Sequence, residues 1–255
     1  MRSYWFGFLI ALQFFTSIPI RKEIPMNPVY VERTVRMLPL VGILQGAIYS
    51  GCVYILLEWS PFSDLAAAFT IWLLAIAVTG GLHLDGWIDS SDAYFSYRDR
   101  AKRLEIMADP RIGAFGVISV IVLLAAKFLF MYEVVQKAEG MTYVWIMAIP
   151  FLGKMVAGLM LMFAPAAKNE GLAHFFQQAC RRQTVWMYPV YLFFFLWNKE
   201  MFLMMISAFL LFVIGRKVAV KAFGGITGDV VGAAAEGTEA GLWMIVWLLH
   251  YGATG

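Results

Sequence analysis

Long apolar runs constrain the fold of this chain more than any other feature of its sequence. A helix needs about 20 apolar residues to cross the roughly 30 Å hydrocarbon core of a bilayer, and backbone that crosses it must satisfy its hydrogen bonds within helices or a closed barrel. The mean hydropathy of +0.72 excludes a water-soluble domain of this size. We therefore predict an all-α, polytopic membrane helical bundle. The apolar runs lie at residues 37–57, 65–82, 112–132, 141–163, 185–214 and 242–253.

Two of these runs affect the number of predicted spans. The run at 185–214 is interrupted by Asn198-Lys199-Glu200, and we divide it into two short spans; the run at 242–253 is also short. Tilt or bilayer thinning accommodates such deficits. The division predicts about six to seven spans in a single integral-membrane domain, residues 1–255.

The first apolar stretch, Tyr4 to Ile20, has three interpretations. As a signal peptide it lacks a good small-residue cleavage site, because Thr16-Ser17-Ile18-Pro19 follows its apolar part. As a retained segment it is either a span or an interfacial helix. We favour a retained, interfacial segment.

Lys and Arg alternate along the connecting segments, and the alternation predicts the topology. Positively charged loops stay in the cytoplasm. This rule places 83–111, 164–184 and 215–241 on the cytoplasmic face of the cell (inner) membrane. Because topology accounts for the net charge of +3, the charge gives no reason to expect a nucleic-acid partner. The counts are four in 21–36, none in 58–64, five in 83–111, one in 133–141, three in 164–184, one at Lys199 and three in 215–241.

A polar, acid-rich segment, residues 80–92, interrupts the apolar pattern. Asp85, Asp89 and Asp92 stand at i, i+4 and i+7, so on a helix they share one face and repel one another unless cations neutralise them. Oxygen-rich clusters suit Mg²⁺. A solvated helix end would explain one such acid, but three at a membrane boundary favour a metal site, with Asp89 also catalytic. His83 fits a general base or a hydrogen-bonded boundary residue equally well.

A second polar segment, residues 224–236, has a related pattern. At Gly225, Thr227 and Gly228 the backbone N–H groups are free to face phosphate oxygens. Asp229 and Glu236 lie on one helical face and are predicted as further metal ligands. Glycines alone also serve close helix packing, so the acids decide the interpretation. The likeness to 80–92 leaves open either chance or an internal repeat.

Cations outside these segments complete the predicted site. Arg111 has a planar fork that holds a phosphate through two bonds, and Asp109 either orients it or binds a metal. Lys154 stands inside a predicted span, where we prefer contact with an anionic substrate over a structural ion pair. Lys127 lies nearer the end of its span and is interpreted as snorkelling. Carboxylates, glycines and cations together predict phosphoryl transfer at a membrane surface with Mg²⁺.

The order and spacing of the motifs are specific. They are Gly80-Gly81-Leu82-His83-Leu84-Asp85-Gly86 with Asp89 and Asp92, Leu104-Glu105-Ile106-Met107, Asp109-x-Arg111-x-Gly113, and Gly224-Gly225-x-Thr227-Gly228-Asp229 with Gly232-Ala233. With the opening Phe8 to Ile20, they resemble the cobalamin synthase family, also called adenosylcobinamide-GDP ribazoletransferase. Departures are Ala93, Ile226 and Gly153-Lys154, which put one turn and two substrate contacts in doubt.

The resemblance implies a Mg²⁺-dependent membrane transferase. In that family a ribose hydroxyl of α-ribazole, or of its 5′-phosphate, attacks the cobinamide-bearing phosphate of adenosylcobinamide-GDP, and GMP leaves. The acidic motifs would then form the metal and pyrophosphate site. Which acceptor is used, how many metals bind, which group is the general base and whether the chain forms a homo-oligomer all stay open.

Three other hypotheses share part of this pattern. CDP-alcohol phosphotransferases also use spaced Asp residues and Mg²⁺, but their Asp-x-x-Asp-Gly-x-x-Ala-Arg pattern is absent here. Secondary transporters place acids and glycines at a midplane site, whereas these acids cluster at one boundary. The third hypothesis is a membrane scaffold without chemistry. Against it, we expect Asp89→Asn to abolish nearly all GMP release with unchanged membrane insertion, and full retained activity would count against the metal assignment.

Overall fold

The structure is a computed structural model that describes residues 2–252 except 181, 194 and 197. Within this part of the chain every regular element is a helix, and an isolated parallel β-bridge joins Ala166 to Ile226. The predicted all-α class is confirmed. In chain order the elements are α1 (Arg2–Phe15), α2 (Pro28–Trp59), α3 (Asp64–Thr79), α4 (Leu82–Phe95), α5 (Arg100–Met107), α6 (Ala114–Val135), α7 (Thr142–Phe163), α8 (Gly171–Ala179), the 3₁₀ helix η1 (Arg182–Trp186), α9 (Met187–Phe193), α10 (Lys199–Phe223) and α11 (Gly228–Gly252).

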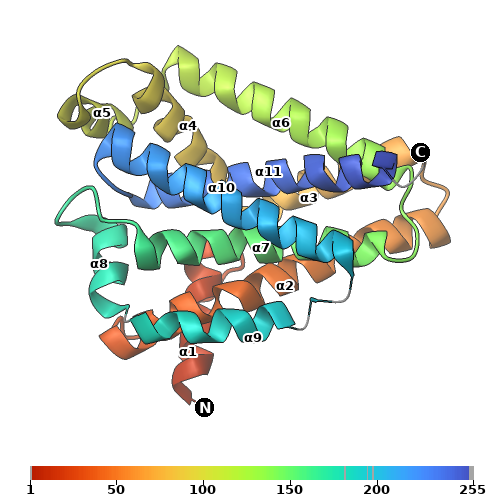
Figure 1. The fold of residues 1–255 in the computed structure, drawn as a ribbon, viewed down its shortest axis with the longest axis horizontal. Coiled ribbons are helices and arrows are strands. Elements are labelled where there is room, and N and C mark those ends of the chain that lie inside the picture. Colours follow the sequence, from red (N-terminus) through yellow and green to blue (C-terminus); the bar gives the residue numbers. More distant parts are fainter. Residues whose placement is uncertain (1, 181, 194, 197, 253–255) are drawn as a thin grey trace.

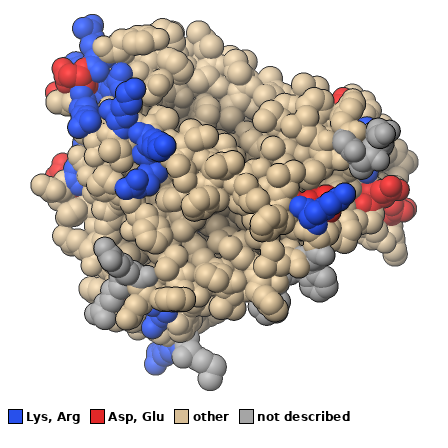
Figure 2. All heavy atoms as spheres, in the orientation of Figure 1, with Lys and Arg blue, Asp and Glu red and all other residues tan. Residues whose placement is uncertain are grey.

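The long helices run along the long axis of the molecule, and their connections gather at its two ends (Figure 1). α5, α8 and the turn between α10 and α11 lie at one end, and the loop between α6 and α7 lies at the other. The three segments predicted to share a face, 83–111, 164–184 and 215–241, therefore reach the same end. Figure 2 shows Lys and Arg side chains gathered there, over α5 and the adjacent end of α10.

Four helices are long and apolar enough to cross a bilayer: α2, α6, α7 and α10. A fifth crossing results if α3 and α4, which are bent by 84°, form one broken span. Apolar helices of this kind make the chain a membrane protein, but the predicted six to seven spans are not confirmed. α9 has seven residues, a length of about 10 Å, and a helix that short cannot cross a bilayer.

The two short predicted spans differ from the observed helices for local reasons. The break at Asn198 is a helix start, because the Asn198 side chain accepts a hydrogen bond from Met201 N at 2.9 Å and α10 continues for 25 residues. The run at 242–253 is the second half of α11, whose first half carries Asp229, Glu236 and Glu239. The length of an apolar run therefore underestimates the length of a helix whose polar half is buried in protein.

α7 forms the centre of the bundle, with 78% of its apolar window buried against other helices. α2 approaches it closely at two glycines. A Cβ on Gly42 would lie 2.6 Å from the Pro150 carbonyl oxygen, and Gly46 meets the α7 backbone at Met147 in the same way. Small residues at helix contacts are how membrane helices gain close packing, because lipid supplies little hydrophobic driving force between them.

α1 packs against the bundle. It has 14 residues, about 21 Å, which is too short to span the hydrocarbon core. Its Gly7 contacts α2 at Arg33, and the Gln13 side-chain amide donates to the carbonyl oxygens of Ile20 at 3.0 Å and Lys22 at 3.1 Å. An interfacial position for this helix stays a prediction, and its length and tertiary packing agree with it.

Candidate active site

Gly80 and Gly81 turn the chain from α3 into α4. Both have positive φ, 63° and 75°, a conformation that residues with a side chain rarely adopt. The turn bends the chain by 84° and sends α4 toward the end of the bundle that carries α5 (Figure 1). The two glycines therefore set the direction in which the acids of α4 are presented.

α4 crosses the beginning of α11, and Gly86 makes the contact close. A Cβ at Gly86 would lie 2.5 Å from the Asp229 carbonyl oxygen, so only glycine fits there. The crossing brings together acids that are far apart in the sequence: the negative charge of Asp85 acts on Asp229, and both charges act on Asp89. The structure thus assembles three acids from the two predicted segments at one place.

Asp229 lies in the first turn of α11, where the helix dipole favours a negative charge. Thr227 Oγ1 lies 3.2 Å from Asp229 Oδ2. Lys168, from the loop before α8, places a positive charge near the same carboxylate. The sequence analysis used Lys168 only as a topology signal, so its place in the site is a finding of the structure.

Two cavities adjoin at α8 and the start of α11. One, of about 380 Å³, is bounded by α5, α8 and residues 226–229, and the other, of about 270 Å³, is bounded by α1, α4, α8 and α11. The polar residues lining the larger are Lys168, Glu170, Thr227 and Asp229, and those lining the smaller are Gln13, His83, Asp85 and Asp229. Asp229 borders both cavities. The arrangement suits an extended ligand with a charged centre.

The acids suit a divalent cation that arrives with phosphate oxygens. Among the described residues, no three His, Cys, Asp or Glu side chains gather as ligands of a single ion. Mg²⁺ usually keeps several waters and binds one or two carboxylates together with substrate phosphates. Asp85 and Asp229 supply carboxylates in the cavity walls, and the charges of both act on Asp89, which lines neither cavity. This donor set fits Mg²⁺ bound jointly with a pyrophosphate.

A protein family described as cobalamin-5-phosphate synthase matches residues 7–247. The chain belongs to this family. Three relatives with the name adenosylcobinamide-GDP ribazoletransferase come from Geobacillus thermodenitrificans (strain NG80-2), 42% identical over 100% of both chains, Geobacillus sp. (strain WCH70), 39% identical over 98% of both, and Halalkalibacterium halodurans, 34% identical over 97% of both. No solved structure matches the chain. The resemblance found in the sequence is confirmed.

Asp92 holds the start of α6. Its Oδ2 accepts a hydrogen bond from Gly113 N at 2.6 Å, and its Oδ1 accepts one from Gly116 N at 2.8 Å. A Cβ at either glycine would overlap the carboxylate. Both oxygens accept backbone hydrogen bonds, so the structure shows Asp92 capping α6, and its predicted metal ligation stays a prediction.

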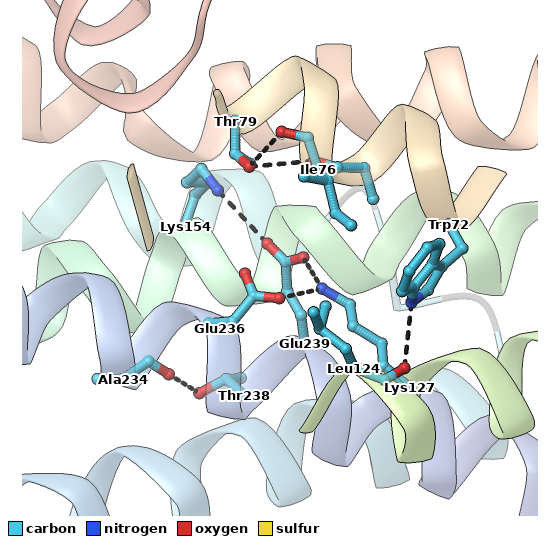
Figure 3. Close-up of polar contacts among 11 residues, drawn as sticks. Trp72, Ile76, Thr79, Leu124, Lys127, Lys154, Ala234, Glu236, Thr238 and Glu239 are labelled. Atoms are coloured by element: carbon cyan, nitrogen blue, oxygen red, sulfur yellow. Dashed lines mark hydrogen bonds and ion pairs between the residues drawn. The ribbon is translucent and has the colours of Figure 1, made fainter. Parts of the chain in front are cut away.

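Glu236, predicted as a metal ligand, and Lys154, predicted beside an anionic substrate, lie inside the bundle (Figure 3). Lys127 Nζ contacts Glu236 Oε1 at 2.5 Å and Glu239 Oε2 at 3.3 Å, and Lys154 Nζ contacts Glu239 Oε1 at 3.4 Å. The four side chains are at most 4% exposed. These contacts correct three predictions, because Glu236 and Lys154 are taken up by ion pairs and Lys127 does not snorkel.

Glu239 is the member of this network that the sequence analysis missed. It stands three residues after Glu236, which puts both on one face of α11, and that spacing was the available signal. Gly153 leaves room for it, because a Cβ there would lie 2.8 Å from Glu239 Cγ. The family departure at Gly153-Lys154 therefore has a structural explanation.

Asp109 and Arg111 form a bidentate ion pair. Arg111 Nε lies 2.9 Å from Asp109 Oδ1, and Arg111 Nη2 lies 2.6 Å from Oδ2. The Arg111 guanidinium holds the pKa of the Asp109 carboxyl well below its usual range. Of the two predicted roles for Asp109, the structure shows the orientation of Arg111. The Arg111 side chain is 87% exposed and accessible to a ligand.

His83 is buried against the smaller cavity. Its side chain lies beside Phe15, with ring centroids 6.0 Å apart, and beside Gly232, where a Cβ would be 3.3 Å from His83 Cα. Neither ring nitrogen has a hydrogen-bond partner among the described residues. A role as general base stays a prediction, and the unpartnered nitrogens keep it chemically available.

The glycine segment divides into a packed part and an open part. Gly225 fits against the backbone of the 165–167 loop, and Ile226 bonds that loop through Ile226 N to Pro165 O at 2.8 Å. Ile226, a departure from the family pattern, is 1% exposed and acts through its backbone. Gly228 faces open space at the larger cavity beside Thr227. Thr227 and Gly228 therefore remain the part of the segment that can meet a phosphate.

Proposed function

We propose that this chain joins adenosylcobinamide-GDP to α-ribazole, or to its 5′-phosphate, and releases GMP. Membership of the family and the names of its relatives support this reaction. The structural observation that carries it is the meeting of Asp85 and Asp229, from distant parts of the sequence, at two adjoining cavities. Paired acids at a divided cavity suit a pyrophosphate substrate that carries a divalent cation and an acceptor that approaches it.

The proposed reaction exchanges one P–O bond for another. The ribose hydroxyl oxygen of the acceptor attacks the phosphorus that bears cobinamide, and the bond from this phosphorus to the bridging oxygen of the pyrophosphate breaks. GMP leaves with the bridging oxygen as part of its phosphate. The hydroxyl proton leaves during the attack, and His83 and Asp89 are the groups of this chain proposed to accept it. Bound Mg²⁺ would neutralise the charge that grows on the leaving phosphate.

The chain mainly positions the reacting groups and balances their charge. We assign the metal to Asp85, Asp89 and Asp229. Lys168 and the backbone of residues 227–228 border the larger cavity and are assigned to the phosphates. Arg111 is placed at the substrate entrance because it is exposed and held by Asp109.

We place the site on the cytoplasmic face of the cell (inner) membrane. The alternation of Lys and Arg along the loops supports this orientation. The gathering of basic side chains at the end that carries α5 supports it further (Figure 2). Both substrates and Mg²⁺ would then reach the acids from the cytoplasm without crossing the bilayer.

The proposal is tested with the purified chain in detergent, Mg²⁺, adenosylcobinamide-GDP and α-ribazole. We expect GMP and a corrinoid that carries its nucleotide loop, both followed by chromatography, and no product when any component is omitted or EDTA is added. Substituting α-ribazole 5′-phosphate for α-ribazole identifies the preferred acceptor by kcat/KM. Release of GMP without acceptor, or product formation in EDTA, would contradict the proposal.

A further inference from the structure

A groove of about 440 Å³ lies between α4, α10 and α11 and shares no lining residue with the two cavities of the proposed active site. Its walls are mainly apolar and aromatic. They include Trp87, Tyr94, Phe95, Leu211, Ile214 and Val218. α10, which forms one wall, has only 22% of its apolar window buried, so this wall belongs to the flank that faces lipid.

Two residues that line the groove each carry a buried polar atom without a protein partner. Trp87 Nε1 and Ser90 Oγ are buried and have no hydrogen-bond partner among the described residues. Ser90 as a whole is 9% exposed, and both residues line the groove. Buried donors of this kind are costly unless a ligand or water meets them. The two residues lie in a wall that is otherwise mainly apolar, which suits a long apolar ligand.

One end of the groove adjoins a cluster of cations. Arg103 connects the two: its Cζ lies 5.5 Å from the ring centroid of Tyr94, a groove residue, and its Nη1 donates to Ala222 O at 3.3 Å. Residues 98–105 and the end of α10 at 216–221 carry seven cations and two acids, Asp99 and Glu105, and Glu105 pairs with Lys102 at 2.6 Å. Figure 2 shows the cations over α5 and the adjacent end of α10. They are Arg98, Arg100, Lys102, Arg103, Arg216, Lys217 and Lys221.

We propose that this groove binds an anionic phospholipid, with an acyl chain between α4, α10 and α11 and the phosphate on the basic cluster. A neutral lipid would make no use of the cations, and a nucleotide has no apolar body for the groove. Basic pockets between membrane helices bind anionic head groups in this way. The site is separate from the proposed chemistry, so it does not depend on the proposed function.

The test is a native mass spectrometry titration of the purified full-length chain with phosphatidylglycerol and with phosphatidylcholine of the same acyl chains. We expect phosphatidylglycerol to bind at least about tenfold more tightly. The double variant Arg100→Gln/Arg103→Gln should lose about tenfold for phosphatidylglycerol and leave phosphatidylcholine unchanged. Gly215→Phe should weaken both lipids, because Gly215 lines the groove and has open space in front of it.

Matched variants elsewhere separate this site from general effects. Lys137→Gln removes a cation that lies 4.3 Å from the Tyr251 ring, and Gly51→Phe adds a ring at a helical glycine of α2 that also faces open space. Both should bind lipid as the unchanged chain does. Equal affinity for the two lipids, losses in the controls equal to those at the site, or displacement of phosphatidylglycerol by adenosylcobinamide-GDP would each overturn the proposal. Melting temperatures in detergent confirm that each variant is folded.

Discussion

Two sets of acids on the same helix, α11, have opposite surroundings. Glu236 and Glu239 lie inside the bundle and are matched by Lys127 and Lys154 (Figure 3). Asp229 lies at a cavity beside other acids. The charge of a buried acid that pairs with a lysine is balanced within the protein. Neighbouring acids at a cavity are instead neutralised by cations from outside. The difference separates a structural network from a candidate site.

The largest effect is expected at the uncompensated acids. Asp89→Asn should lower kcat for GMP release by on the order of a hundredfold to a thousandfold, because it removes a carboxylate of the proposed metal site. The melting temperature should not fall, since the substitution removes a like charge beside Asp85 and Asp229. GMP release and thermal unfolding in detergent measure the two effects. Full activity, or a loss explained by unfolding, would remove Asp89 from the site.

For the buried, ion-paired acids Glu236 and Glu239 we expect substitution to lower stability. Glu239→Gln leaves Lys154 buried without a carboxylate, and we expect a loss of about 3–5 kcal/mol in the free energy of unfolding. The double variant Glu239→Gln/Lys154→Met removes both charges and should be less destabilised than the single variant, as a double-mutant cycle would show. If the two substitutions cost the sum of their separate effects, the ion pair is not the source of the stability.

Asp92 belongs to neither group of acids, because its carboxylate accepts backbone hydrogen bonds from Gly113 and Gly116. Asp92→Asn keeps one acceptor oxygen, so the cap of α6 should weaken by about 1 kcal/mol. The Mg²⁺ concentration that gives half-maximal activity should stay unchanged in this variant and rise in the matched variant Asp85→Asn. Activity titrated with Mg²⁺ distinguishes the two residues. An equal rise in both would support the metal role predicted for Asp92.

The sequence was sufficient for the helical class and for the meeting of residues 80–92 with residues 224–236. It was not sufficient for the depth of individual acids. Asp229 and Glu236 share a face because they are seven residues apart, yet two helical turns move a side chain by about 10.5 Å along the axis. That distance takes Glu236 from the cavity into the bundle, where Lys127 from α6 meets it. Partners on other helices decide such cases, and a single sequence does not reveal them.

The predicted span boundaries differ from the observed helices for a related reason. Hydropathy is averaged over a window of residues. The apolar run in α11 therefore began only after the polar half of the helix, and the run at 185–214 included residues on both sides of Asn198. It also counted 65–82 as a simple span, although the chain bends at Gly80 and continues as α4. Glycine conformation and helix capping by a polar side chain are local signals that give these boundaries more directly.

The smallest effect is expected at the exposed pair, Asp109 and Arg111. Arg111→Lys keeps the charge but loses the bidentate fork, so we expect KM for adenosylcobinamide-GDP to rise about tenfold with little change in melting temperature. Asp109→Asn should have a smaller effect, because Arg111 keeps its charge and loses only its orientation. The lowered pKa of Asp109 keeps the pair ionised until the pH falls well below the usual Asp range, so its contribution to KM should be constant around neutral pH. We compare KM for Arg111→Lys and for the unchanged chain near neutral pH. If the two values are equal there, the bidentate pair of Asp109 and Arg111 does not act on the substrate.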